Sequence, residues 1–200
     1  MAIHSIQWRR LDGPGMETFE LNEGEPGGPR LRGTAAGAIR GRPFALRYEV
    51  ECDDDWLPRH AEVTVDLPAV KKSLKLSQDD GTWQIDGREA PELEGCRDLD
   101  LAFSPSTNTL PIRRFALKVG ELGSTRAAWV LFPTLEVRSI DQQYRRVAVD
   151  RYRYRSGDAE REYQGGFRTV LTVGAGGLVM EFPGLWRASR DGSGNPHGPA

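Results

Sequence analysis

Apolar and polar residues alternate along most of this chain. In the segment LRYEVE, Leu46, Tyr48 and Val50 fall on one side and the charged residues between them fall on the other. A repeat of two residues is the repeat of a β-strand, and one apolar side is what a sheet with a single buried face requires. The same alternation recurs in residues 61–67, 72–77, 82–86, 97–103, 114–119, 167–173 and 178–182.

Turn-forming residues separate these runs at short intervals, as in QDDG at 78–81 and GAGG at 174–177. Short strands with such spacing predict antiparallel hairpins. Many strands with one apolar face cannot stay flat, so they must close into a barrel, a sandwich or a roll. We therefore expect an all-β, mainly antiparallel fold with a strongly curled sheet and little helix.

Three segments need a separate interpretation. Residues 68–77 fit a strand, with room for a short turn before it, better than a helix. Residues 22–37 are rich in glycine, proline and charge and predict a long loop. In VAVDRYRYR the apolar side changes parity near Asp150, which predicts a bulge or bend there, or a segment with both faces partly covered.

Length and composition favour one domain. Two hundred residues suit a single domain, which we place at residues 1–188. Residues 189–200 have little to bury and are predicted to be a disordered tail. The net charge is −2, so we expect no field of one sign that would recruit nucleic acid or an anionic membrane.

Location and redox state follow from what the sequence lacks. The N-terminal residues show no apolar signal-peptide core, and no window has eighteen apolar residues in a row. Cys52 and Cys96 stand far apart and outside any CxxC motif, so they predict no disulfide framework. A cytoplasmic protein without an integral membrane segment is the expectation.

Metal and cofactor motifs are also missing from the sequence. His4, His60 and His197 are the three histidines, and none stands at ligand spacing from another. The glycines of VGAGGLVMEF do not form GxGxxG, and a strand follows them where a helix would be needed. We expect no metal and no cofactor.

Two groups of residues could carry hydrolytic chemistry. Asp98 and Asp100 share one side of a strand about 7 Å apart, within the range of the two carboxylates of an inverting glycosidase. The alternative is the solvent-facing side of a strand whose other side carries the leucines. Ser104, Ser106, Thr107 and Thr109 offer hydroxyls, but no GxSxG elbow surrounds them and His60 is the only internal histidine.

Aromatic residues are candidates for a binding surface, because tryptophan and tyrosine bury a large area and keep a polar group. Most should lie in the core. A minority that lined a concavity would suit sugar rings or acyl chains. The candidates are Trp83, Trp129, Tyr152 and Tyr154.

The segment FSPSTNTLPIRR, residues 103–114, predicts a rigid corner between two strands. Its two prolines fix φ, Leu110 before Pro111 should be extended, and the Thr107–Thr109 side chains can bond nearby backbone groups. The corner can also present Asn108 with Arg113 or Arg114 to a phosphate, sulfate or carboxylate. Neighbours in a strand point to opposite faces, so the two arginines should not form one clamp.

The stretch CRDLDLAFSPSTNTLPIRRF resembles the signature of a bacterial family described as "putative glycolipid-binding". SIQWRRLDGPGMETFEL at 5–21, GTWQIDG at 81–87, YRY at 152–154 and GLVMEFPGLWR at 177–187 agree with that family, and together the matches run from Ile6 to Arg187. The resemblance implies a spiral β-roll, similar to the carriers that move lipoproteins across the bacterial periplasm.

The resemblance also implies a function, although a fold alone does not fix one. We expect non-catalytic binding of a lipid or glycolipid in the concave apolar interior of the sheet, with no nucleic-acid partner. The expected ligand-binding residues are Asn108, Arg113, Arg114, Trp83, Trp129, Tyr152, Tyr154, Asp98 and Asp100. A small hydrolase acting on a sugar or ester, and a ligand-free β-roll that serves as an interaction module, stay open as alternatives.

Overall fold

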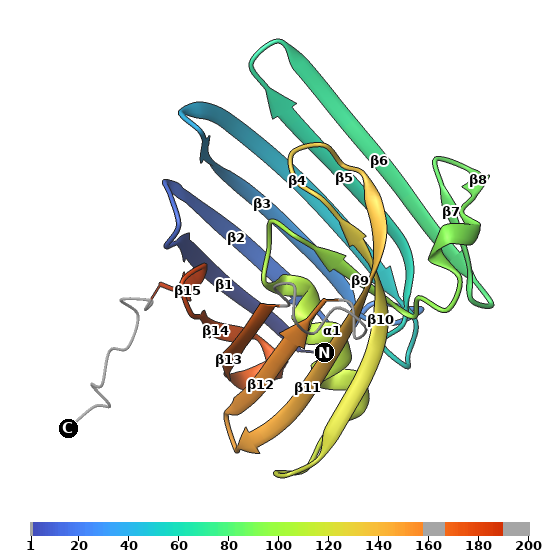
Figure 1. Ribbon diagram of the computed structural model, residues 1–200, viewed down its shortest axis with the longest axis vertical. Helices are drawn as coiled ribbons and strands as arrows, with labels where there is room; N and C mark the ends of the chain where they lie inside the picture. Colours follow the sequence, from blue (N-terminus) through green and yellow to red (C-terminus); the bar gives the residue numbers. More distant parts are fainter. Residues whose placement is uncertain (1, 158–166, 190–200) are drawn as a thin grey trace.

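The computed structural model describes residues 2–157 and 167–189, and fifteen strands within them form one sheet (Figure 1). The strands are β1 (Ile3–Arg10), β2 (Gly15–Asn22), β3 (Arg30–Ile39), β4 (Arg42–Cys52), β5 (Pro58–Leu67), β6 (Val70–Asp79), β7 (Thr82–Ile85), β8 (Arg88–Glu89), β9 (Asp98–Leu101), β10 (Leu122–Val130), β11 (Val137–Ala148), β12 (Arg151–Ser156), β13 (Phe167–Val173), β14 (Val179–Phe182) and β15 (Trp186–Ala188). The helical segments are η1 (Pro91–Leu93), η2 (Ser106–Asn108), α1 (Thr109–Phe115) and η4 (Ala175–Gly177).

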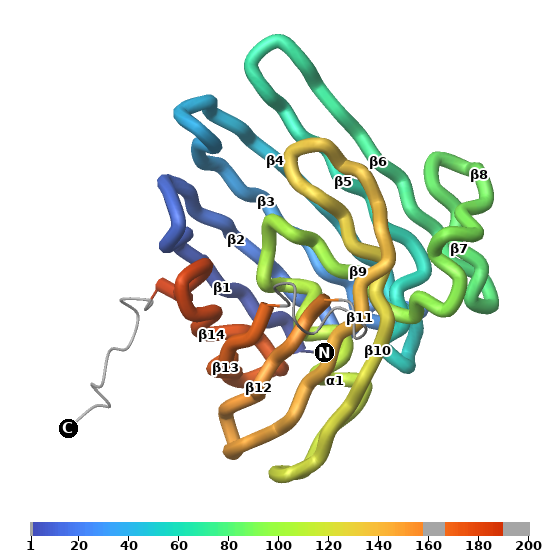
Figure 2. Tube along the Cα trace, viewed as in Figure 1, coloured from blue at the N-terminus to red at the C-terminus, as the bar shows by residue number. Residues whose placement is uncertain are grey.

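The strand order is β8-β7-β6-β5-β4-β3-β2-β1-β15-β14-β13-β12-β11-β10-β9. All neighbours are antiparallel except β9 and β10. Pairing of β1 with β15 joins an N-terminal half to a C-terminal half, while β8 and β9 stay as the two edges, so the sheet is not a closed barrel. Figures 1 and 2 show the sheet curling round α1, which confirms the predicted all-β, mainly antiparallel, strongly curled fold.

Each long strand of the N-terminal half buries one side. In β4 the residues Phe44, Leu46, Tyr48 and Val50 are buried, and those between them are exposed or partly buried. We call the buried side the inner face and the opposite side the outer face. The same parity continues through β2, β3, β5 and β6, so one apolar surface covers the inside of the curl.

The predicted loop at 22–37 is mostly wrong. Only the residues between Asn22 and Arg30 connect strands, and the remainder belongs to β3. Gly33 and Ala35 lie at inner positions of this strand. They are small, so the strand lacks the large apolar residues that make the alternation visible elsewhere.

The change of parity at 147–154 has a simpler cause than a single bent strand. A hairpin turn at Val149 and Asp150 separates β11 from β12, and the predicted irregularity occurs beside it, as a register shift between Arg146 and Ala148. Residues 68–77 lie mainly in β6, as the alternation predicted. Residues 190–200 of the predicted tail lie outside the described residues.

The predicted corner at 103–114 contains a helix. Residues 109–115 form α1, so the expectation that Leu110 is extended is wrong. Pro111 is the third residue of α1, where the backbone nitrogen needs no partner within the helix. The helix ends at Phe115, and the next residue, Ala116, has a φ of 45°. Arg113 and Arg114 are therefore helical neighbours, about 100° apart round the axis, and do not alternate across a strand.

Candidate ligand-binding site

A cleft of ≈ 1560 Å³ lies at the end of the curl where three hairpins turn. The turns are those of β1–β2, β3–β4 and β5–β6, and the loop between β10 and β11 faces them (Figure 1). We call it the hairpin-end cleft. Its lining residues are Arg10, Asp12, Gly13, Pro14, Ala38, Ile39, Arg40, Gly41, Arg42, Leu67, Pro68, Ala69, Val70, Phe132 and Pro133.

The floor of the hairpin-end cleft is apolar. Ile39, Leu67 and Val70 continue the inner parity of their strands beyond the packed core. Phe132, from the facing loop, packs its ring 4.9 Å from that of Phe44 and 5.6 Å from that of Phe103. The cleft is thus the open end of the concave inner face, and its walls suit an acyl chain.

Cations line the rim of the hairpin-end cleft. Asp12 holds Arg10 through two hydrogen bonds of 2.7 and 3.0 Å. Arg40 and Arg42 are exposed and pair with no other side chain among the described residues. Lys72 reaches across and donates to the Pro133 carbonyl at 3.4 Å. Two unpaired guanidinium groups above an apolar floor are suited to the charged or polar head of an amphiphile.

Behind the floor lies a buried polar cluster formed by Glu17, Tyr48, Ser104 and Ser106. Ser104 donates to Glu17 Oε1 at 2.6 Å, and its oxygen lies 2.8 Å from the Ser106 hydroxyl, from which it can accept. Burial raises the pKa of Glu17 to about 8, and the hydrogen bonds from Ser104 and Tyr48 only partly offset it. Glu17 is 0% exposed, so the cluster fastens the 103–108 segment to the sheet and cannot meet a substrate from solvent.

The alternative in which Asp98 and Asp100 form the solvent-facing side of a strand is wrong. Asp98 is fully buried and accepts hydrogen bonds from Arg114 and from Thr125, the latter at 2.6 Å. Asp100 accepts from Gln142. Burial raises the pKa of both carboxyls, that of Asp100 to about 6. Leu99 and Leu101 are buried as well, because the edge strand β9 is covered on both faces.

The other residues predicted in the 103–114 segment also have partners within the protein. Arg113 donates to Glu23 at 2.6 Å, and its guanidinium lies 4.5 Å from the centre of the Trp56 ring. Asn108 accepts from the Tyr144 hydroxyl at 3.0 Å. Thr107 accepts from the Leu101 backbone, as the turn chemistry of the segment predicted.

The predicted aromatic residues are mostly core. Trp83 is buried and donates to the Cys96 carbonyl at 2.8 Å. Tyr152 and Tyr154 are buried too, and Trp129 is partly buried. None of the nine predicted site residues lines the hairpin-end cleft. A ligand-binding role for them stays a prediction.

Sequence reasoning missed the residues of the hairpin-end cleft. Its lining comes from four turns that lie far apart in the chain and meet only through the strand order. One signal was available in the sequence, since Ile39 and Leu67 extend an apolar alternation to the edge of a turn. An apolar residue next to a turn either covers the end of the core or lines an opening into it.

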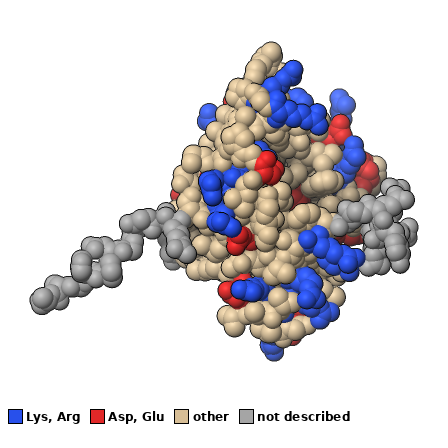
Figure 3. Space-filling model, turned by 60° about the vertical axis from the view of Figure 1, so that its left-hand side comes forward, with Lys and Arg blue, Asp and Glu red and all other residues tan. Residues whose placement is uncertain are grey.

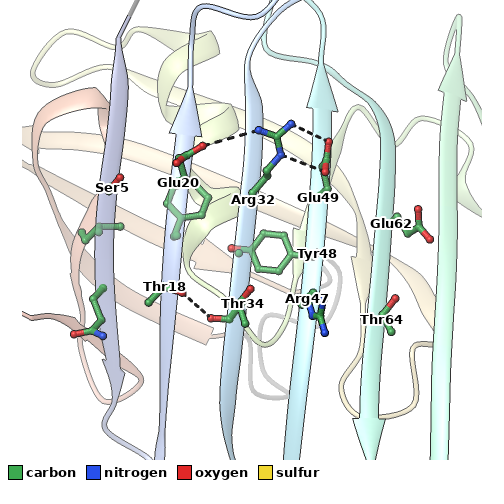
Figure 4. A pocket seen from close by; sticks show the side chains of 14 residues that line it. Ser5, Thr18, Glu20, Arg32, Thr34, Arg47, Tyr48, Glu49, Glu62 and Thr64 are labelled. Atoms are coloured by element: carbon green, nitrogen blue, oxygen red, sulfur yellow. Dashed lines mark hydrogen bonds and ion pairs between the residues drawn. The ribbon is translucent and has the colours of Figure 1, made fainter.

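A second hollow of ≈ 750 Å³ lies on the outer face of β1–β5 (Figure 4). Three of its charged side chains pair with one another. Arg32 lies between Glu20 and Glu49, at 3.9 and 3.3 Å from their carboxylate oxygens. Thr18 donates to the Thr34 carbonyl at 3.4 Å. This surface is polar and largely satisfied, so it suits an acyl chain less well than the hairpin-end cleft does.

The described residues contain neither a metal-binding cluster nor a membrane-spanning helix. Over 2–157 and 167–189, no group of three or more His, Cys, Asp and Glu residues is arranged to hold a metal ion. In the same part of the chain, no helix has the length and apolar character needed to cross a membrane.

Comparison with known proteins gives two matches. Residues 5–188 match the model of a family described as "Putative glycolipid-binding". The fold is similar to the crystal structure of a DUF1089 family protein from Pseudomonas aeruginosa, with a TM-score of 0.75 and 32% sequence identity, over 87% of this chain and 91% of that one. None of the curated proteins matches the chain.

Proposed function

We propose that this chain, which belongs to the family described as "Putative glycolipid-binding", binds a lipid or glycolipid in the hairpin-end cleft without catalysis. The observation that carries the proposal is the combination in one cleft of an apolar floor and unpaired cations at the rim. An amphiphile needs both, whereas a sugar or a small acid needs only the second.

The proposed ligand lies with its acyl part against Ile39, Leu67 and Phe132. Its head group lies near Arg40 and Arg42, which can donate to a phosphate, a carboxylate or sugar hydroxyls. The deeper part of the curl is not available to the ligand, because α1 and the 103–108 segment bury their side chains there. Binding is therefore expected at the open end of the concave face and not throughout it.

A ligand-free interaction module is the second candidate. The filled interior beneath the cleft favours it, since a carrier of two long acyl chains would need a deeper cavity. Under this alternative the hairpin-end cleft would stay empty in the cell.

Native mass spectrometry of the untagged protein, purified gently and followed by lipid extraction, tests the proposal. We expect a stoichiometric adduct that extracts as a lipid or glycolipid. Leu67→Trp fills the cleft and should abolish the adduct. Thr64→Trp, on the outer face of the same strand, is the matched control and should retain it. A clean apo mass after incubation with total host lipid, or an adduct that persists in Leu67→Trp, would overturn the proposal.

A further inference from the structure

The two ends of the N-terminal half carry opposite charge, although the net charge of the chain is small. The hairpin turns with their flanking residues, 9–14, 39–42 and 66–72, hold six cations and two acids. The cations are Arg9, Arg10, Arg40, Arg42, Lys71 and Lys72. The acids are Asp12 and Asp66, which pair with Arg10 and Lys71, so an excess of four positive charges remains.

The opposite end is acidic. The connections 23–29, 53–57 and 79–81 hold seven acids and no cation, namely Glu23, Glu25, Asp53, Asp54, Asp55, Asp79 and Asp80. Arg30 and Arg59 flank these connections, and each is ion-paired with an acid there. In a meander of antiparallel strands, successive turns lie at opposite ends of the sheet. Basic and acidic turns alternate along this sequence, so the basic turns gather at one end and the acidic turns at the other.

The basic end also exposes apolar groups. Val70 is 48% exposed at the β5–β6 turn, next to the exposed Pro68 and Ala69. Met16, which lies beside the β1–β2 turn, is 50% exposed. The β5–β6 hairpin forms the top of the molecule in Figure 1, and Figure 3 shows Lys and Arg side chains gathered near the top.

We propose that the three hairpin turns dock the protein on an anionic lipid bilayer, with the mouth of the hairpin-end cleft facing the membrane. The cations approach the lipid phosphates, and Val70 enters the interface between head groups and acyl chains. The acidic end points away, because the same surface potential repels it. This proposal departs from the expectation, drawn from net charge, that no anionic membrane attracts this chain. The fold places the basic and the acidic residues of the N-terminal half at different ends, although their charges nearly cancel in the total.

The arrangement of charge favours a bilayer over a nucleic acid as the partner of the three hairpin turns. The cations stand on three separate turns round an apolar opening, where a nucleic acid would require a continuous basic track. A docked orientation would also let an amphiphile pass between the bilayer and the cleft without exposing its acyl chain to water. The inference goes beyond the proposed function, since docking needs the turns and ligand retention needs the cleft.

Flotation with lipid vesicles tests the docking. We expect binding to vesicles of phosphatidylcholine with one third phosphatidylglycerol, weakened by salt, and far weaker binding to phosphatidylcholine alone. Each cation near such a surface contributes about 1 kcal/mol, or about fivefold in the partition coefficient. Arg40→Gln/Lys71→Gln should therefore lower the partition coefficient by at least about tenfold. Val70→Asp should also lower it.

Matched controls come from the same chain. Arg88→Gln/Lys118→Gln removes the same charge from exposed residues outside the cleft, and Val119→Asp changes a valine that is 57% exposed before β10. Both should bind like the wild type. Equal binding by the two double variants, or no binding of the wild type to anionic vesicles at low salt, would overturn the proposal.

The blocked-cleft variant separates this inference from the proposed function. Leu67→Trp should still bind anionic vesicles while it loses the lipid adduct. If the wild type retained its lipid adduct but did not bind anionic vesicles, the docking proposal would be refuted and the ligand-binding proposal would stand.

Discussion

The Tyr48 hydroxyl on β4 donates a 2.5 Å hydrogen bond to Glu17 Oε1 on β2, although β3 lies between the two strands. The contact is made over Gly33, which pairs with Tyr48 in the register of β3 and β4. A Cβ atom on Gly33 would lie 2.2 Å from the Tyr48 ring. The missing side chain of β3 is thus what lets the tyrosine reach the carboxyl group.

Gly33→Ala should destabilise the protein, because the added methyl group must push the Tyr48 ring away from Glu17. The expected loss in the free energy of unfolding is about 1–3 kcal/mol, the usual range for an overpacked core. Urea denaturation measures it. Gly13→Ala is the control, since a Cβ there meets its nearest atom at 3.9 Å, and it should leave the midpoint unchanged. Equal midpoints for the two variants would contradict the role given to Gly33.

Glu17→Gln should reduce the dependence of stability on pH. Burial raises the pKa of Glu17 from its ordinary 4.5 to about 8, so the folded state binds a proton that the unfolded state releases. The free energy of unfolding of the wild type therefore falls as pH rises from about 4.5 to about 8. Glutamine stays neutral, so at pH 8 the free energy of unfolding of the variant should exceed that of the wild type by an amount on the order of a few kcal/mol.

Urea denaturation of both proteins at several pH values between 5 and about 9 measures this difference across the window in which the linkage acts. The pKa values of Asp98 and Asp100 are raised too, so some dependence on pH should remain in the variant. Glu20→Gln, on the outer face of the same strand, should follow the wild type. Parallel profiles for wild type and Glu17→Gln would show that Glu17 is ionised in the folded protein.

The parts of the fold that sequence could predict are those with large apolar residues at every second position. The segment around Leu46 and Tyr48 gives β4 directly. Residues 30–37 were predicted to be loop because the inner position of Gly33 has no side chain, so the apolar alternation is not visible there. The helix α1 was missed because Pro111 argues against helix everywhere except in the first turn.

The site was harder to predict than the fold, for a topological reason. Arg42 and Leu67 line one cleft only because the β1–β2, β3–β4 and β5–β6 hairpins turn at the same end of the sheet. Asp98, in contrast, was selected because its spacing from Asp100 suggested chemistry. Asp98 is buried by α1 and β10. The alternation within one strand shows that one face is apolar, but it does not show whether the polar face is covered as well.

Cys52 and Cys96 should be almost unreactive in the folded protein. They are 4% and 1% exposed, and burial raises the pKa of both thiols, that of Cys96 to about 11. The thiolate is the reactive form, and about one Cys96 thiol in a thousand would be ionised at pH 8. Labelling with a thiol reagent should be slow until urea unfolds the chain. Ser124→Cys, at an exposed position, should add one fast equivalent; a fast equivalent in the wild type would refute the prediction.

Arg114→Leu should be the most damaging change near α1, because it leaves the buried Asp98 carboxylate without its cation. Breaking such a pair costs about 3–5 kcal/mol, and the Arg114 and Asp98 side chains are only 14% and 1% exposed. Asp98→Asn should cost less, since asparagine can still accept from Thr125 and Arg114 can move toward water. In the double variant the loss should fall short of the sum by at least about 1 kcal/mol.

A double-mutant cycle from urea denaturation at pH 7 measures this coupling. The exposed pair of Arg187 and Glu181 is the matched control, with side chains 55% and 36% exposed. Its cycle should give less than about 1 kcal/mol, because water screens a surface ion pair. If the two cycles gave the same coupling, Asp98 would not be a buried charge held by Arg114, and the attachment of α1 to β9 would rest on apolar packing alone.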